Sequence, residues 1–488
     1  MKNLSVATLK DIIPLLRPRS GDANASGDGV VCVVDFNAPP PYLVNLQTNA
    51  FTGYLALLLG SKCVTFPPVR GYAHYLTTCL GVDYRSDAHI VVPFLPDIHP
   101  FGSVAAAFKH AVVTKQLQTS SAAEGVFWNL AFTSDTERNL PMLGEAFTTA
   151  ALCARLNRKA ILQDPGLRKR AQFSVLPGVV LPRGRSAALA SIRELMATHR
   201  RVWLKSVHGE GGDLVFAVED GDQVPDRFDQ LMLRIKQYLD QHSAIRTGGD
   251  HGDLFEMYAE PDVSLVIAAE LGSHDGPGRL FDVNLQIVVH TDGVAEIGHT
   301  LQQTTLDGGY VGNASIPSFE SSNPDFGRFL RLARIQAEIF GSFAYELGYR
   351  GFVGLDIKGS ADRAFIVDPN CRINGSTPQI MLANLRHKPF SLGATIKFGR
   401  TIASYDEAIE LIGRNLCIDL SAGRDAGVAI LAFRPSFDRA LLPGDIVRAN
   451  AAKAVILADN ESQLSGFTVA LHRAGFLDSA FAFPNMAT

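Results

Sequence analysis

Short apolar runs alternate with helical stretches over the first third of the chain. Runs typical of buried strands lie at 30–37 (VVCVVDFN), 62–68 (KCVTFPP) and 89–97 (HIVVPFLPD), and helical stretches lie at 51–60 and 72–81. Continuous apolar runs of this length are typical of strands that are covered on both faces of a parallel sheet. The alternation therefore predicts an open α/β domain that extends to about residue 145.

The pattern changes near residue 150. Helical stretches are predicted at 151–173, 186–200 and 326–348. Strand-like runs are predicted at 201–207, 213–219, 253–260, 264–272 and 283–297. Two further strand-like runs, 427–435 and 452–460, precede a helix at 462–476. This order predicts a mixed central domain followed by a small α+β unit.

Polar residues interrupt one strand-like stretch, GFVGLDIKGSADRAFIVDPNCRINGSTPQI, which covers residues 351–380. Gly351–Ile357 and Ala364–Val367 have the composition of two strands, and residues 359–362 that of a hairpin turn. Asp368 and Asn370 are two residues apart, so strand alternation places them on one face, with Arg372 next if the strand continues. Asp356 lies on the partner strand.

These residue types suit metal and phosphate chemistry. Two carboxylates and an amide oxygen form a hard oxygen site of the kind that Mg²⁺ prefers. A guanidinium beside a metal-bound phosphate, here Arg372, would stabilise anionic charge that develops during transfer. A solvated hairpin with a surface Asp–Arg pair is the alternative interpretation.

A helix is expected to follow directly. Thr377 is a suitable N-cap and Pro378 a suitable first helical residue, so the helix would begin beside the carboxylates. Its free amides would favour an anion there, although the helix could instead only cap the strand pair.

A lysine precedes a glycine-rich loop in RVWLKSVHGEGGDLVF. Lys205 is followed by Gly209, Gly211 and Gly212. Glycines allow backbone N–H groups to close on a phosphate, and a nearby ammonium adds positive charge. A hairpin turn with a surface lysine explains the same residues, because the stretch matches neither the dinucleotide fingerprint nor the P-loop pattern.

Composition narrows the class of protein. The chain has 488 residues, of which 47% are hydrophobic and 19% charged, and this balance predicts a globular protein of two or three domains. The net charge of −4 and the lack of a basic block argue against a nucleic-acid partner. Six scattered cysteines without a C-x-x-C pair favour a reduced, cytoplasmic compartment. Charges interrupt the apolar part of the first 20 residues, so we expect no signal peptide, and no run is long enough to predict a membrane span.

Taken in order, these residues resemble the ATP-grasp superfamily. Lys159 in LNRKAIL is similar to the family's first ATP-binding lysine. Lys205 is similar to the second, and the HGEGG stretch after it is similar to the family's glycine-rich loop. Glu256 in LFEMYAE, followed by Tyr258, is similar to the segment that contacts adenine. Asp356 and DPNCR are similar to the acidic strand residue and the E-x-N-x-R motif, with Asp368 in place of the usual Glu. The loop also carries His208 and Glu210, where small residues are commoner.

The resemblance implies a fold and a set of domains. It implies an amino-terminal pre-ATP-grasp α/β domain over 1–145, an ATP-grasp domain over 146–390 with a mobile β-rich lid at about 171–258, and a carboxyl-terminal α+β subdomain over 391–488. It also implies binding of ATP and of one or two Mg²⁺ ions. The ions would be held by Asp356, Asp368 and Asn370, with catalytic roles for Lys205 and Arg372.

The implied activity is ATP-dependent ligation of a carboxylate to an amine through an acyl phosphate, with release of ADP and phosphate. The partners would be a small carboxylic acid or peptide and an amine or amino acid, and a homodimer is compatible with this. The domain layout and the stretch TTLDGGYVGNASIP resemble pheganomycin-type peptide ligases of natural-product pathways, which implies that substrate contacts come from Gly309, Tyr310, Asn313, Asn374 and Ser376. Ligation or carboxylation in primary metabolism, or an ATP-binding sensor without catalysis, are the alternatives.

Two other groups carry less chemistry. His208, His290 and His299 match no zinc-ligand spacing, so core or exposed roles are expected for them. Cys371 lies within the predicted site, but its neighbours need no thiol nucleophile.

Overall fold

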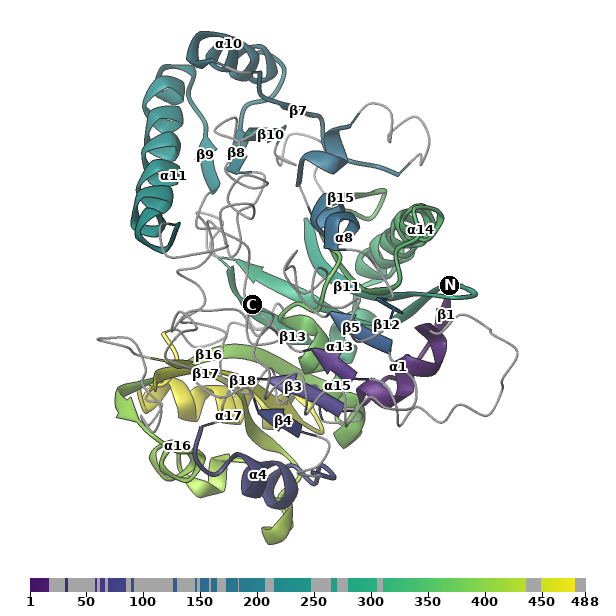
Figure 1. The fold of residues 1–488 in the computed structure, drawn as a ribbon, viewed down its shortest axis with the longest axis vertical. Helices are drawn as coiled ribbons and strands as arrows, with labels where there is room; N and C mark the ends of the chain where they lie inside the picture. The colour runs from purple at the N-terminus through teal and green to yellow at the C-terminus, as the bar shows by residue number, and fades with distance from the viewer. Residues whose placement is uncertain are drawn as a thin grey trace.

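Three sheets organise the part of the chain that the computed structural model describes (Figure 1). The described residues are 1–16, 31–33, 58, 62–65, 69–84, 89–91, 126–129, 145–146, 150–157, 159–164, 173–182, 184–206, 215–246, 265–269, 280–304, 310–435 and 449–478. Within these ranges no helix combines the length and the apolar character needed to cross a membrane.

The first sheet is parallel and lies in the amino-terminal part of the chain. Its order is β4-β3-β2-β5-β6, and every neighbouring pair in it is parallel. The strands are β2 (Val31–Val33), β3 (Lys62–Thr65), β4 (His89–Val91), β5 (Val126–Asn129) and β6 (Glu145–Ala146). The helices of this part are α1 (Leu9–Leu16) and α4 (Tyr72–His74), which continues as a π-helical turn over Tyr75–Cys79. The parallel sheet of the predicted α/β unit is confirmed, whereas its predicted helix at 51–60 lies outside the described residues except for Leu58.

The second sheet is antiparallel and has its own core. Its order is β7-β10-β8-β9, with strands β7 (Gly178–Val180), β8 (Val202–Ser206), β9 (Val215–Val218) and β10 (Leu265–Ala269). Helices α10 (Arg185–Met196) and α11 (Val224–Arg246) belong to the same unit, which forms the upper part of Figure 1. Residues of both helices and of β8 and β9 form a hydrophobic cluster of their own, separate from the main core. We call this unit the lid sheet.

The third sheet has nine strands and holds most of the remaining chain. Its path is β15-β14-β11-β12-β13-β16-β18-β17, and β1 (Lys2–Asn3) pairs with β12 in parallel. The other strands are β11 (Phe281–His290), β12 (Gly293–Thr304), β13 (Tyr310–Ser315), β14 (Gly351–Ser360), β15 (Arg363–Asn370), β16 (Phe390–Ile402), β17 (Gly427–Pro435) and β18 (Ala449–Ala458). The predicted domain boundary at residue 390 falls on the first residue of β16.

Helix α14 (Pro324–Glu346) covers one face of this large sheet. Its apolar side contacts β11, β12, β14 and β15, and Gly341 permits a close approach to β11 and β12. A Cβ atom at Gly341 would lie 2.7 Å from Val294 Cγ1 and 2.9 Å from Ile287 Cδ1. Phe281 of β11 packs against Phe326 and Phe329 of the helix, with ring centroids 5.3 and 5.4 Å apart. We call this side the α14 face.

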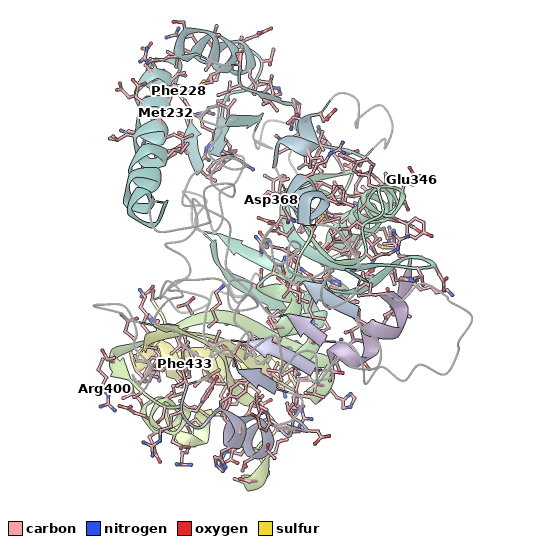
Figure 2. The ribbon with its side chains drawn as sticks, viewed as in Figure 1. Phe228, Met232, Glu346, Asp368, Arg400 and Phe433 are labelled. Carbon is pink, nitrogen blue, oxygen red and sulfur yellow. The ribbon has the colours of Figure 1, made fainter. Side chains whose placement is uncertain are left out.

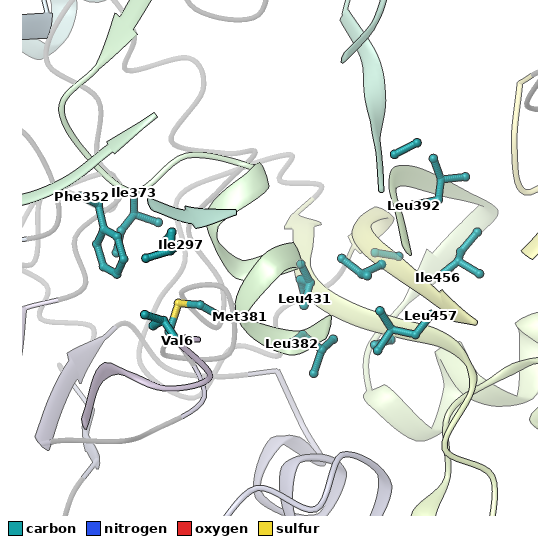
Figure 3. Packing of buried hydrophobic residues seen from close by; sticks show 14 of the residues in the cluster. Val6, Ile297, Phe352, Ile373, Met381, Leu382, Leu392, Leu431, Ile456 and Leu457 are labelled. Atoms are coloured by element: carbon teal, nitrogen blue, oxygen red, sulfur yellow. The ribbon is translucent and has the colours of Figure 1, made fainter. Parts of the chain in front are cut away.

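Helix α15 (Ser376–Arg386) joins two halves of the main core. Figure 3 shows its residues Met381 and Leu382 between a group that includes Phe352 and Ile373 and a group that includes Leu392 and Ile456. The remaining helical elements are α8 (Ala150–Asn157), η7 (Lys159–Gln163), η8 (Gly221–Gln223), α13 (Pro317–Ser322), α16 (Tyr405–Ile412), η10 (Arg414–Leu416), η11 (Leu420–Ala422) and α17 (Glu461–Arg473). Because the cluster is continuous, the parts on either side of α15 form one core.

Most predicted elements of the second half that fall on described residues are present, with several differences. The hairpin expected at 351–367 is β14 and β15, with its turn at 361–362. The helix expected to begin with Thr377 as N-cap begins at Ser376 instead, with Gly375 in the cap position. Strands β13 and β16 and helices α11 and α16 were not predicted, and the predicted run at 253–260 lies outside the described residues.

Candidate functional site

The register of three neighbouring strands brings the predicted carboxylates together. Asn284 of β11 lies opposite Asp356 of β14, which in turn lies opposite Asp368 of β15. One step along the strands, Gln286, Gly354 and Asn370 form a second row. Because side chains alternate along a strand, both rows project from the same face of the sheet. We call this the polar face; Figure 2 labels Asp368, one of its residues.

The alternate positions of the same strands explain why the polar face is held in place. Leu285 and Leu355, which lie opposite each other between the two rows, are fully buried. Strand residues that bury apolar side chains on one face must present their polar neighbours on the other. The register is therefore fixed by the α14 face, and the polar rows follow from it.

The two aspartates form the most distinctive electrostatic feature of this face. Asp356 and Asp368 are both half-buried and directly opposed. Like charges at opposed positions of a sheet repel each other, and a cation bound between them would remove the repulsion. Asp356 Oδ1 also accepts hydrogen bonds from Asn284 Nδ2 and Gln302 Nε2. The donor set of two carboxylates and the amide of Asn370 fits Mg²⁺.

The predicted metal site contains fewer than three His, Cys, Asp or Glu side chains, unlike many metal sites in proteins. No group of three or more such side chains arranged to hold a metal ion exists among the residues described. The predicted set contains two carboxylates and one amide, so its metal would keep positions for water or phosphate oxygens.

The segment after β15 carries the next predicted residues. Arg372 is half-buried, and its Nη1 donates to the carbonyl oxygen of Ile373 at 3.5 Å. Asn374 and Ser376 are buried, and Asn313 Nδ2 of β13 donates to Ser376 Oγ at 2.6 Å. Of the predicted substrate residues, the structure thus brings Asn313, Asn374 and Ser376 together.

The start of α15 does not offer the free amides that the sequence suggested. Asn374 Oδ1 accepts the backbone N–H groups of Ser376 at 3.1 Å and Thr377 at 3.3 Å. Pro378 has no N–H group. The first three residues of the helix therefore have no amide left for an anion, and that expectation is wrong because Asn374 caps the helix from within the chain.

Lys205 brings positive charge from the lid sheet. It lies in β8, is half-buried, and acts electrostatically on Asp282 of β11. Burial raises the pKa of the Asp282 carboxyl, and the charges of Lys358 and Lys205 partly oppose this rise. Lys358 Nζ lies 2.8 Å from Asp282 Oδ2, and Lys358 faces Asp282 across β14 and β11. A lid lysine and the polar face therefore share one electrostatic environment.

Asp282 and the two amides that follow it were not among the predicted residues. Asp282, Asn284 and Gln286 recur at every second position in FDVNLQIVV, which is the same signal that identified Asp368 and Asn370. Applied to this strand, the alternation would have placed all three on one face.

Several predicted residues lie outside the described ranges. These are Gly209, Gly211 and Gly212 of the glycine loop, Glu256, Tyr258 and Gly309. Lys159 and Tyr310 are described only in their backbone, at the starts of η7 and β13. Element η7 contacts β15, so Lys159 belongs to a segment next to the strand that carries Asp368.

A second charged cluster lies on the α14 face of β12. His299 Nε2 lies 2.6 Å from Glu320 Oε1, and its Nδ1 lies 3.4 Å from Glu296 Oε1. Arg334 of α14 donates to both oxygens of Glu296, at 2.8 and 3.1 Å. A β-bulge opposite Gln286 and Ile287 turns Glu296 and His299 toward the same side.

The charges of this cluster shift both of its central pKa values. Burial alone would lower the pKa of His299, but the hydrogen bonds and charges of Glu296 and Glu320 raise it to about 9. Burial likewise opposes ionisation of Glu296, but hydrogen bonds from His299 and Arg334 lower its pKa to about 2. His299 is therefore a buried cation near neutral pH, which agrees with the core role expected for it.

Comparisons with known proteins give a likeness in structure only. No protein-family model matches the sequence, and no curated protein matches it. The biotin carboxylase of Campylobacter jejuni, solved with β-γ-ATP, is similar with a TM-score of 0.52 at 12% identity, over 91% of each chain. The N5-carboxyaminoimidazole synthase of Aspergillus clavatus, solved with ADP and 5-aminoimidazole ribonucleotide, is similar with a TM-score of 0.50 at 12% identity, over 92% of this chain and 99% of that one. At these identities the likeness shows the fold.

Proposed function

We propose that this chain, whose fold is the ATP-grasp fold, is an ATP-dependent ligase that joins a carboxylate to an amine through an acyl phosphate and releases ADP and phosphate. The acceptor would be a small carboxylic acid or a peptide, and the nucleophile an amine or amino acid. A role in peptide or amide formation for natural-product biosynthesis is the finer form of this proposal.

The observation that carries the proposal is the opposed pair Asp356 and Asp368 on a polar face that Lys205 of the lid sheet influences. A metal-binding carboxylate pair beside a lysine from a second sheet is suited to holding a triphosphate between them. Phosphoryl transfer requires positioning and charge neutralisation more than a protein nucleophile.

Each described residue would have a separate task. Asp356, Asp368 and Asn370 would hold one or two Mg²⁺ ions, and Lys205 would hold phosphate oxygens together with Lys159 and the loop at 208–212. When bound, MgATP would supply the phosphoryl group. Arg372 would stabilise negative charge on the acceptor carboxylate and the phosphoryl group, because a guanidinium presents two parallel donors to such oxygens.

The acceptor side would be formed by uncharged groups. Asn313, Asn374 and Ser376 are linked to the same hydrogen-bonded cluster and carry no charge. Together with Gly309 and Tyr310 they would orient the acid by hydrogen bonds. A water-excluding lid would protect the acyl phosphate from hydrolysis.

Hydroxylamine trapping tests the proposal. The enzyme, given ATP, Mg²⁺ and a panel of amino acids, short peptides and small acids without amine, should release ADP and form a hydroxamate as hydroxylamine displaces phosphate. Asp368→Asn should lower the hydroxamate yield by about 100-fold or more, the scale for losing an electrostatic contact in a transition state. Asp362→Asn, in the exposed turn of the same hairpin, is the matched control and should retain activity.

The outcomes separate this proposal from its alternatives. ADP release that depends on bicarbonate, with no organic acid trapped, would indicate a carboxylase. Binding of MgATP without ADP release under any condition would indicate a sensor. Hydroxamate formation that is unchanged in Asp368→Asn would refute the assignment of the opposed carboxylates.

A further inference from the structure

The carboxylate of Asp356 is connected to the start of α15 by a chain of side-chain hydrogen bonds. Thr377 Oγ1 donates to Gln286 Oε1 at 2.9 Å. Gln286 Nε2 donates to Asn374 Oδ1 at 2.8 Å and also to Asn284 Oδ1. Asn284 Nδ2 in turn donates to Asp356 Oδ1.

The direction of every bond in this chain is fixed at its two ends. At one end, backbone N–H groups of Ser376 and Thr377 donate to Asn374 Oδ1, and a backbone N–H group can only donate. Gln286 must therefore direct its NH₂ group toward Asn374. At the other end an ionised Asp356 can only accept, so Asn284 must direct its NH₂ group toward it and its oxygen toward Gln286. Both ends require the same orientation of Gln286.

The fold reserves space for this arrangement. Gln286 and Thr377 are fully buried, and Asn284 is 2% exposed. Position 354, directly opposite Gln286 on β14, is a glycine, and a Cβ atom there would lie 2.5 Å from Gln286 Nε2. A larger residue would displace the amide that connects the two ends. Buried polar networks of this kind hold one geometry only when every member is satisfied.

We propose that Gln286 is a positioning residue for the metal site, which acts through Asn284 to fix the rotation of the Asp356 carboxylate. By binding Oδ1 through fixed amides, the network would hold the Asp356 carboxylate in one orientation on the strand pair that also carries Asp368 and that would hold a divalent cation. This inference rests on the proposed function. Groups that hydrogen-bond a metal ligand commonly change metal affinity about 10-fold to 100-fold when they are replaced.

Gln286→Glu tests the donor role because it keeps the shape of the side chain and removes its two N–H donors. At pH 8 the ionised Glu would place oxygen against the oxygens of Asn284 and Asn374. At pH 6 a buried Glu, whose pKa burial raises, regains one O–H donor and approaches the native pattern. Gln286→Met cannot donate at either pH.

Mn²⁺ serves as the probe because carboxylate and amide oxygens also suit that ion. Its affinity in the presence of ADP is measured from the electron paramagnetic resonance signal of free Mn²⁺. We expect Gln286→Glu to bind Mn²⁺ about 10-fold more weakly than the wild type at pH 8 and to recover most of this at pH 6. Gln286→Met should bind about 10-fold more weakly at both values. The melting temperature of metal-free Gln286→Glu should likewise be lower than that of the wild type at pH 8 and recover most of the difference at pH 6.

Gln379→Glu is the matched control. Gln379 is also fully buried, but its Nε2 donates to Ser391 Oγ at 2.9 Å and to the Asn313 carbonyl at 3.3 Å, away from Asp356. Its Mn²⁺ affinity should equal that of the wild type. Wild-type affinity in Gln286→Glu at pH 8, or a loss that is the same at pH 6 and pH 8, would overturn the inference alone. Failure of the wild type to bind Mn²⁺ with ADP would overturn the proposed function and this inference with it.

Discussion

The buried histidine on the α14 face should make the stability of the protein fall as the pH rises above neutrality. The hydrogen bonds and charges of Glu296 and Glu320 overcome burial and raise the pKa of His299 to about 9, whereas an unfolded histidine has a pKa near 6.5. The folded protein therefore binds one proton more than the unfolded chain between these two values. Stability contributed by this proton is fully present below pH 6.5 and is lost as the pH rises through 9.

The size of the effect follows from the difference in pKa. A pKa unit corresponds to about 1.4 kcal/mol, so the shift of His299 corresponds to about 3 kcal/mol of unfolding free energy. The free energy of unfolding should fall by up to about 1.4 kcal/mol for each pH unit between 6.5 and 9. Glu296 adds no slope in this range, because its pKa is lowered to about 2 and its contribution is lost only as the pH falls from 4.5 through that value.

Urea unfolding at several pH values from 6 to 10 measures this slope. We compare the wild type with His299→Gln, which keeps hydrogen-bonding capacity and removes the titration, so that all other titrations cancel in the difference. His290→Gln is the control. Burial lowers the pKa of His290, so its contribution rises with pH only below 6.5 and is constant above it. Identical slopes for the wild type and His299→Gln would refute the reasoning.

Three further predictions concern packing and ligand binding. Gly341→Ala should lower the free energy of unfolding by about 1 to 3 kcal/mol, because the added methyl group overpacks against the large sheet. Gly327→Ala in the same helix has open space around it and should raise the free energy of unfolding by up to about 1 kcal/mol. Chemical denaturation of both variants checks this contrast, and equal effects would contradict it. Tyr75→Phe should cost about 1 to 3 kcal/mol, because it removes the hydroxyl that accepts the buried Ile430 N–H at 2.7 Å, and a thermal melt equal to that of the wild type would show that this amide has another partner. Lys205→Ala should weaken ATP binding measured by calorimetry by at least about 10-fold, because a charge-assisted contact to phosphate is lost, and unchanged affinity would remove this lysine from the site.

Strand alternation was sufficient to predict the local part of the site. Asp368 and Asn370 are two residues apart on a strand whose other positions are apolar, so their common face could be predicted without knowing any partner. Their alignment with Asn284 of β11 could not, because strand register depends on pairings between segments about 70 or more residues apart. The amide chain through Gln286 depends on the same long-range register.

The start of α15 and strand β16 are two of the elements that the sequence pattern predicted poorly; α11, β13 and α16 are others. At the start of α15, Thr377 has the composition of an N-cap, but Asn374 reaches the amides first and moves the helix start to Ser376. Strand β16 is interrupted by glycines that lower its strand propensity. Gly393 is needed there because a Cβ atom would lie 2.6 Å from Gln379 Oε1, and this requirement comes from a distant helix.

Because the lid sheet has a core of its own, we expect it and the large sheet to behave as two cooperative units. The large sheet runs unbroken from β15 to β17 around one hydrophobic cluster, so its strands should exchange their amide hydrogens only when the whole sheet opens. The lid sheet has its own cluster, so we expect its amide hydrogens to exchange independently of that unit. A ligand held both by Lys205 and by the polar face would join the two units energetically, so its binding would appear as slower hydrogen exchange in β8 and β9 as well as in the large sheet.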